Sequence, residues 1–186
     1  MTRRTAGAAV LTVVAIALAA LVWHKLPNNT SIYAPFDVHA VIHTAAVGEN
    51  LSATVTGAGI APSVRSRPTS KPVSAAGTWL VAVTSLNVER APVLPRADLM
   101  VGPNTYLPTD RLLSTNAMVQ PGLTLGCAWV FDVPVDLLDS VPSVVLRVWS
   151  GDERLDSRLV MEIPLNDASV GRQDSILIPQ AQTVAR

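Results

Sequence analysis

Two patterns of hydrophobic residues divide the chain. The first is a run of 18 residues from Ala6 to Trp23 that carries no charge, and an α-helix of that length spans about 27 Å. From Phe36 onward, apolar and polar residues instead alternate in short runs that are separated by turn residues. A period of two residues is typical of β-strands with one buried face. The sequence therefore predicts a helical segment followed by an all-β domain.

The apolar segment is predicted to be a transmembrane helix over residues 6–25, preceded by a cytoplasmic N-terminus of residues 1–5. Its length is close to the roughly 30 Å thickness of a bilayer's hydrocarbon core. Arg3 and Arg4 precede the helix, and basic residues favour the cytoplasmic side. Lys25 can extend its ammonium group to the headgroups. We therefore expect a single-pass protein of the plasma membrane, with its N-terminus inside and its C-terminal domain outside.

Cleavage by a signal peptidase is the alternative to a retained anchor. Ala17 and Ala19 fit the small-x-small pattern of a cleavage site, and cleavage after Ala19 leaves an apolar region of normal signal-peptide length. The apolar run nevertheless continues through Trp23 instead of ending before the cleavage site. We favour the anchor, and a mature N-terminus at Ala20 would show that the helix is removed.

The β domain is predicted over residues 36–165, between a stalk at 26–35 and a loosely ordered C-terminal tail at 166–186. An apolar patch at Ile176-Leu177-Ile178 gives the tail one segment that can dock on the domain or on a partner. Seven or eight short strands without helices favour a two-sheet sandwich. The expected strands are Phe36–Ala45, Leu51–Ala58, Ile60–Arg65, Thr78–Val88, Ala97–Val101, Leu123–Val133, Val144–Trp149 and Arg158–Pro164. Turn signals separate them, among them Gly48-Glu49-Asn50, the segment from Gly57 to Gly59, Pro121-Gly122 and Ser150-Gly151-Asp152.

Charge and cysteine content limit the classes of function. Three of the 14 basic residues flank the apolar segment, which leaves 11 basic residues against 14 acidic ones in the rest of the chain. A mildly acidic domain is a poor ligand for nucleic acid, because binding to phosphates requires clustered Lys and Arg. Cys127 is the single cysteine, so the domain has no internal disulfide and depends on its hydrophobic core.

The stretch from Trp79 to Leu138 carries a family resemblance. Its elements are the strand Ala97–Val101, Tyr106, the turn Pro121-Gly122 and the motif Phe131-Asp132-Val133-Pro134. This pattern resembles the telokin-like, immunoglobulin-like extracytoplasmic family of bacterial envelope proteins of unknown function. The resemblance implies an immunoglobulin-like sandwich outside the membrane, and it implies no catalytic or ligand-binding residues.

The chain departs from that family in two places. Many relatives carry a lipid-anchoring cysteine, which is absent here, and the usual Asn after the early strand is Asn87 followed by Val88-Glu89. The motif residues themselves have structural roles, because Pro121-Gly122 makes a tight turn and Pro134 cannot donate to a β-ladder.

Few residues are suited to nucleophilic catalysis. His24 lies at the predicted membrane boundary, which leaves His39 and His43 as candidate bases. Cys127 alternates with Leu125, Trp129 and Phe131, so we expect a buried and inert thiol. The sequence contains no Gly-x-Ser-x-Gly, no HExxH and no phosphate-binding glycine loop.

Metal binding is predicted to be absent as well. Asp37, His39 and His43 share one strand face, but residues four apart on a regular strand are separated by about 13 Å, too far for one zinc ion. Two acidic clusters lack the glycine-containing spacing of a calcium loop. They are Asp132, Asp136 and Asp139, and Asp152, Glu153 and Asp156. We therefore predict no catalytic, cofactor-binding or metal-binding residue and no cofactor.

Together these observations predict a membrane-anchored, non-catalytic extracytoplasmic module that acts in the cell envelope through protein or lipid contacts. The basic loop Ser63–Ala76 is a candidate for contact with anionic headgroups. The alternative is an accessory subunit of an envelope transport or assembly complex, with small residues such as Ala8, Ala15 and Ala19 packing on a partner's helix. A hydrolase or a metal-binding protein is the least favoured class.

Overall fold

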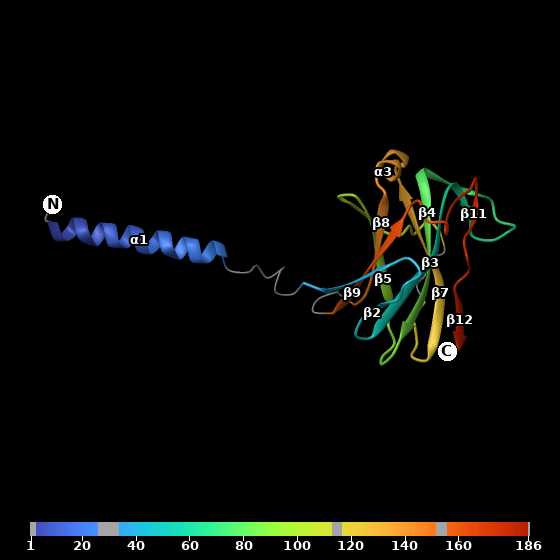
Figure 1. The fold of residues 1–186 in the computed structure, drawn as a ribbon, viewed down its shortest axis with the longest axis horizontal. Coiled ribbons are helices and arrows are strands. Elements are labelled where there is room, and N and C mark those ends of the chain that lie inside the picture. The colour runs from blue at the N-terminus through green and yellow to red at the C-terminus, as the bar shows by residue number, and fades with distance from the viewer. Residues whose placement is uncertain (1–2, 26–33, 113–116, 152–155, 186) are drawn as a thin grey trace. The chain divides into compact units, whose positions relative to one another are not determined.

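The computed structural model describes residues 3–25, 34–112, 117–151 and 156–185. The chain divides into two compact units, Met1–Ala34 and Pro35–Arg186, and the first contains helix α1, Arg3–Lys25 (Figure 1). Among the described residues, no helix is long and apolar enough to cross a membrane. Most of the predicted stalk lies outside the described residues.

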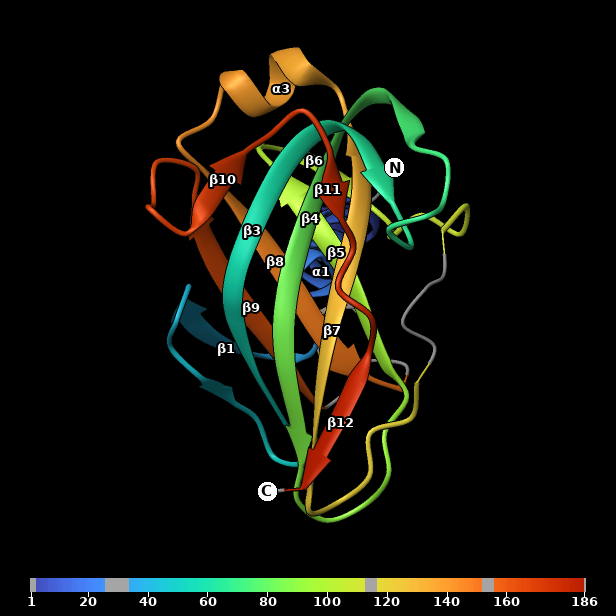
Figure 2. The same cartoon turned by 90° about the vertical axis from the view of Figure 1, so that its right-hand side faces the viewer.

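Two β-sheets packed face to face form the second unit (Figure 2). Sheet A has five strands in the order β1-β9-β8-β5-β6, with the bounds Phe36–Val41, Ser157–Pro164, Ser143–Ser150, Pro95–Val101 and Asn104–Tyr106. Sheet B has seven strands, of which five follow the order β10-β3-β4-β7-β12, with the bounds Val170–Arg172, Leu51–Arg65, Val73–Val88, Leu123–Val133 and Gln182–Ala185. Its other strands, β2 (Ala46–Val47) and β11 (Ile176–Leu177), both pair with β3. The prediction of a mostly β, two-sheet sandwich is confirmed.

A short helix, α3 (Val135–Asp139), corrects the expectation of a domain without helices. It follows directly after Pro134, whose fixed φ suits the start of a helix, and Asp136 lies in its first turn, where a negative charge is favourable. A helix of five residues is too short to produce a visible period of 3.6 in the sequence.

Strand β3 runs without a turn through the segment from Gly57 to Gly59, which the sequence analysis interprets as a turn. The glycines lie on the outer face of sheet B, since Gly57 and Gly59 pair with Val83 and Val81 of β4. A Cβ atom on Gly59 would lie 2.7 Å from Cδ1 of Ile176. The glycines therefore make room for the C-terminal residues instead of turning the chain.

The C-terminal residues form an ordered strap, defined here as residues 170–185, where the sequence predicts a loosely ordered tail. Strands β10 and β11 pair in parallel with β3, and β12 pairs antiparallel with β7. Figure 2 shows the strap passing in front of sheet B, from β3 to β7. Ile176 and Ile178 are 9% and 8% exposed, so the apolar patch docks on the domain and supplies the burial that orders the strap.

The hydrophobic core has two parts that lie on opposite faces of sheet B. Between the sheets, Leu125, Cys127, Trp129 and Phe131 of β7 are buried as the alternation predicts. Ala128 and Val130, which alternate with these residues, are buried as well, in a second cluster on the outer face beneath the strap. Its buried members are Ala61, Val64, Trp79, Val81, Leu112, Ala128, Val130, Ile176 and Ile178.

The motif Phe131-Asp132-Val133-Pro134 joins β4 to β7 at the end of the sandwich that holds α3. The carboxylate of Asp132 accepts hydrogen bonds from the backbone N–H groups of Ala76 and Gly77, both at 2.9 Å. Phe131 and Val133 are fully buried. The motif thus fixes how two neighbouring strands meet, which agrees with its predicted structural role.

Candidate functional site

The β1–β2 turn brings His43 to the start of the C-terminal strap. Its φ of 68° is the only positive value of a non-glycine residue in the described ranges, and this turn ends β1 before the predicted strand end at Ala45. Nε2 of His43 lies 3.0 Å from Oγ of Ser169, and that hydroxyl donates to Oδ1 of Asp167 at 2.6 Å. Because the hydroxyl has one proton, Nε2 of His43 is the donor in its contact with Ser169.

These three side chains do not form a nucleophilic triad. In a triad, the imidazole takes the proton of the hydroxyl and the carboxylate holds the other ring nitrogen. Here Asp167 accepts the hydroxyl proton of Ser169 directly, and its Oδ1 lies 3.9 Å from the same nitrogen, Nε2, of His43. The hydrogen bonds from Ser169 and the nearby His43 lower the pKa of Asp167. The set fastens the β1–β2 turn to the residues that follow β9.

Asp37 and His39 lie apart from that set, on the outer face of sheet A. Asp37 forms a two-pronged ion pair with Arg158 of β9, at 2.8 Å from Nε and 3.0 Å from Nη2. This pairing lowers the pKa of Asp37. His39 pairs with Val160 in the parallel ladder. In the described parts of the chain, no three His, Cys, Asp or Glu side chains form a group that can hold a metal ion.

The Asp37–Arg158 pair predicts a small, pH-dependent contribution to stability. A lowered carboxyl pKa stabilises the fold above the unfolded-state pKa of about 3.9, and this contribution disappears as the pH falls through the folded-state value. We expect Asp37→Asn to lower the free energy of unfolding by less than about 1 kcal/mol at neutral pH. Urea unfolding at several pH values should show that the stability difference between Asp37→Asn and the native protein shrinks in acid. Asp110→Asn, at an exposed position outside the helices and strands, provides the control. If the stability difference stayed the same down to acidic pH, the Asp37–Arg158 ion pair would not be its cause.

The two acidic clusters have structural roles where they are described. Asp132 bonds the backbone of β4, Asp139 accepts a hydrogen bond from Arg172 at 3.1 Å, and Asp136 is exposed. In the second cluster, Asp156 accepts hydrogen bonds from Ser150 and from the backbone of Ser157. Its predicted neighbours at positions 152 and 153 lie outside the described residues.

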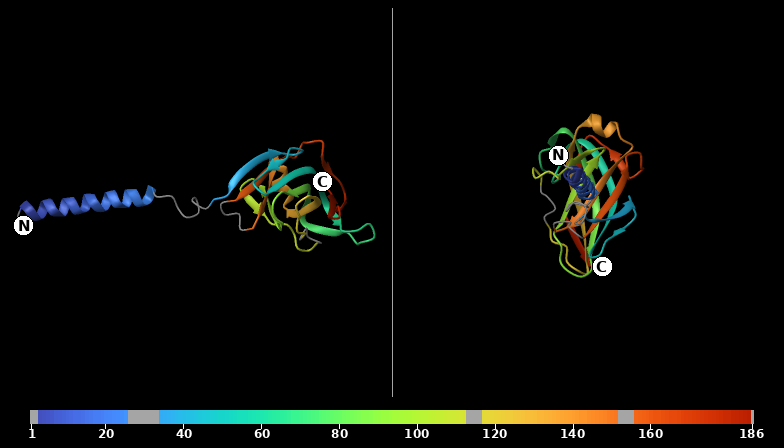
Figure 3. Two further views of the ribbon diagram at one scale, coloured as in Figure 1. Left: turned by 90° about the horizontal axis from the view of Figure 1, so that it is seen from below. Right: turned by 90° about the vertical axis from the view of Figure 1, so that its left-hand side faces the viewer.

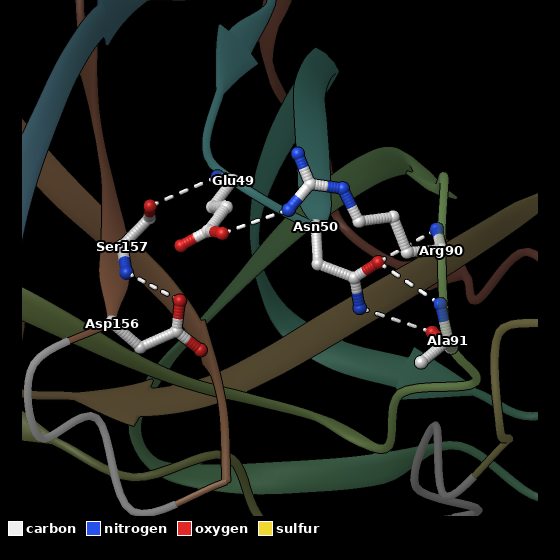
Figure 4. Close-up of polar contacts among 6 residues, drawn as sticks. All are labelled: Glu49, Asn50, Arg90, Ala91, Asp156 and Ser157. Atoms are coloured by element: carbon white, nitrogen blue, oxygen red, sulfur yellow. Dashed lines mark hydrogen bonds and ion pairs between the residues drawn. The ribbon is translucent and has the colours of Figure 1, made fainter.

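A polar network that the sequence analysis does not single out connects three loops at one end of the sandwich (Figure 4). Oδ1 of Asn50 accepts hydrogen bonds from the backbone N–H groups of Arg90 and Ala91 at 2.8 and 3.1 Å. The guanidinium of Arg90 pairs with Glu49 at 2.8 Å, and the backbone N–H of Glu49 donates to Ser157 at 3.0 Å. Each of these side chains bonds a residue of a neighbouring segment, so the network has a structural role.

Cys127 is 1% exposed, as expected for an inert thiol. Its sulfur lies 3.2 Å from Oγ1 of Thr84, and the same hydroxyl accepts a hydrogen bond from Nε1 of Trp129 at 3.0 Å. Buried polar atoms need such partners. Thr84 therefore allows Trp129 to place its indole N–H inside the core.

The outer face of sheet A differs from that of sheet B, because no described segment packs over it as the strap does over sheet B. It presents a hollow of about 440 Å³ that includes His39, Val41, Val145, Val160 and Glu162 among its lining residues. Beside the hollow, the face carries ion pairs on two adjacent rungs of the sheet. They are Asp37–Arg158 and Asp98–Arg147. The surface combines apolar side chains with two ion pairs and with the exposed carboxylate of Glu162, which accepts a hydrogen bond from Ser143 at 2.7 Å.

The second unit of this chain belongs, by its own strand order, to the class of two-sheet β-sandwich domains. No protein-family model matches the chain, and no curated protein matches it. Among solved structures, the chain is similar to an uncharacterized beta-sandwich protein from Clostridium difficile 630, at 12% sequence identity and with a TM-score of 0.49. That similarity covers 74% of this chain and 99% of the other.

His43 is a candidate residue from the sequence, but its partners Ser169 and Asp167 are not. Ser169 is 126 positions away from His43, and both Ser169 and Asp167 lie in the segment interpreted as a tail. Local spacing contains no signal for such a contact. Only the strand pairing of the strap brings these residues together.

Proposed function

We propose that this protein is a membrane-anchored, non-catalytic module on the outer face of a bacterial plasma membrane, acting through protein or lipid contacts. The proposal is based on the complete 18-residue uncharged sequence from Ala6 to Trp23 and on the basic pair Arg3-Arg4 before it. The observation that carries it is the division of the chain into a helical unit and a separate sandwich. Such a division suits a tether that carries an independent binding domain.

We also propose that the sandwich is immunoglobulin-like and related to the telokin-like envelope family. In an immunoglobulin domain, strands C, F and G share one sheet while strands B and E pair in the other. The adjacency of β5, β8 and β9 and the pairing of β4 with β7 support this comparison. The structural role of the motif Phe131–Pro134 supports the family assignment.

The outer face of sheet A is our candidate for the protein contact. Val41 is exposed, and Val145 and Val160 are half-buried in the hollow on this face. Its two ion pairs are satisfied within the domain, so a partner can cover them without supplying opposite charges. Interfaces of this kind combine an apolar centre with polar groups around it.

Site-specific photocrosslinking in cells tests this contact. A photoreactive residue at position 160 should give a discrete adduct with one protein, and the same residue at the exposed position Thr183 on the other sheet is the control. No adduct at position 160, or equal adducts at both positions, would count against sheet A as the contact surface.

The second candidate is an accessory subunit whose helix packs on a multi-pass partner. The small residues Ala8, Ala15 and Ala19 support it, because they permit close approach of a second helix. Replacing the helix with an unrelated anchor should abolish co-purification of the partner under this candidate. Co-purification should survive the replacement if the sandwich alone makes the contact.

A further inference from the structure

A groove lies beneath the strap, on the part of sheet B that Ile176 and Ile178 do not fill. Its volume is about 570 Å³, within the range of roughly 300–1,000 Å³ that is typical of small-molecule sites. The floor is formed by Val83 of β4 and Gly126 of β7, and the strap contributes Leu177, Ile178 and Pro179. The groove is therefore a mainly apolar hollow between sheet B and the strap.

The groove remains open because the side chains of the strap are buried only in its first part. Ile178 is buried, but the following residues are exposed up to the end of β12. Gly126 has no side chain, and a Cβ there would meet only the carbonyl oxygen of Gln182 at 3.8 Å. Nε2 of Gln180 donates to the carbonyl oxygen of Ser66 at 2.7 Å and so holds the strap to the β3–β4 loop.

Positive charge gathers where that loop meets the groove. Ser66 and Pro68 line the groove, and they alternate along the chain with the exposed residues Arg65 and Arg67. Lys71 is exposed in the same loop, and no acidic residue occurs anywhere between Leu51 and Val88. Figure 3 shows the β3–β4 hairpin projecting from the sandwich. In the described ranges, none of the three cations forms an ion pair with a carboxylate.

We propose that this groove binds a single-chain anionic amphiphile, namely a free long-chain fatty acid. Its hydrocarbon chain lies between Val83, Gly126 and Leu177, and its carboxylate lies among Arg65, Arg67 and Lys71. An apolar channel favours the chain in proportion to the methylene groups that it buries. Arg65, Arg67 and Lys71 are exposed in the loop whose Ser66 and Pro68 line the groove, so their positive charge can complement the carboxylate at the groove's edge. The inference depends on the groove and the loop, and it does not require the anchor.

The basic loop and the point where the chain enters the sandwich lie at opposite ends of β3. Phe36 pairs with Ser157, and Ser157 bonds Glu49 beside the start of β3. Strand β3 has 15 residues, which correspond to about 50 Å at roughly 3.3 Å per residue. Within the sandwich, the basic loop therefore lies far from the residue at which the chain enters it.

Photoaffinity labelling tests the proposal on the full chain in its native membrane. A fatty acid with a diazirine near the end of its chain is added, and labelled peptides are identified by mass spectrometry. We expect labels to concentrate on the peptides that contain Val83, Gly126 and Leu177. Affinity for the fatty acid that is free in water, measured by competition with unlabelled fatty acids, should rise about fourfold per added methylene until the groove is full.

Two variants and one lipid control distinguish specific binding of a fatty acid in the groove from nonspecific labelling and from phospholipid binding. Gly126→Phe fills the groove and should reduce the labelling at least tenfold, whereas Thr105→Phe on the exposed edge strand of sheet A should not. Combined Arg65→Gln, Arg67→Gln and Lys71→Gln should weaken binding without altering the fold, which keeps the test informative if Gly126→Phe misfolds. Labelling that is unaffected by both changes, or labelling by a diacyl phospholipid probe alone, would overturn the proposal.

Discussion

Replacing Gly77 with alanine is expected to lower the free energy of unfolding of the sandwich by about 3 kcal/mol. A Cβ atom at this position would lie 2.3 Å from the carbonyl oxygen of Val133 and 2.9 Å from Cα of Pro134. Both are backbone atoms of the segment that ends β7, so no side chain can rotate away. The strands would have to separate where Asp132 bonds the N–H groups of Ala76 and Gly77.

Gly126→Ala is the matched control for this substitution. It introduces the same methyl group on the neighbouring strand β7, where the nearest atom is 3.8 Å away in ordinary contact. Because alanine reduces the conformational entropy of the unfolded chain, this variant should be neutral or slightly stabilising. Chemical denaturation of both variants measures the difference. Equal stability would show that the close approach of β4 and β7 at the motif is not as described.

Removing residues 175–186 is expected to cost about 4 kcal/mol of stability and to cause aggregation. The deletion takes away Ile176 and Ile178, and burial of each such side chain contributes about 1.5–3 kcal/mol. It also uncovers Trp79, Val81 and Val130 of the second cluster. An exposed apolar patch on a sheet face promotes association. Thermal unfolding and size-exclusion chromatography of the truncated protein report both effects.

A shorter deletion provides the control for the strap. Removing residues 182–186 takes away β12, whose described residues are all exposed, and should lower the free energy of unfolding by less than about 1 kcal/mol. If the longer deletion were tolerated as well as the shorter one, the second cluster would not contribute to the stability of the fold.

The sequence predicts most strongly a strand whose inward face carries large apolar residues. The core strand Leu123–Val133 has the bounds that alternation predicts, and its inward residues Leu125, Cys127, Trp129 and Phe131 are buried. The pattern does not reveal that Ala128 and Val130 are buried on the other face. A small residue such as Ala128 carries little periodic signal, and its covering residues come from the distant strap.

Glycine residues predict turns in β3 that the structure does not contain. Gly57 and Gly59 are typical turn residues, but here both lie within strand β3, where Gly59 creates space for Ile176 and Gly57 lies beside the carbonyl oxygen of Ser169. The same dependence on distant residues explains the polar contacts of His43. Its partners Asp167 and Ser169 lie in a segment whose order comes from pairing with β3, and strand pairing between distant segments is not visible in local composition.

Protease accessibility in spheroplasts is the measurement that tests the proposed location most directly. External protease should remove a C-terminal epitope while cytoplasmic proteins stay intact. Without protease, the protein should retain its N-terminal sequence and remain in the membrane after alkaline washing. A protected epitope, or a released protein that begins at Ala20, would contradict a sandwich tethered outside the membrane by its N-terminal helix.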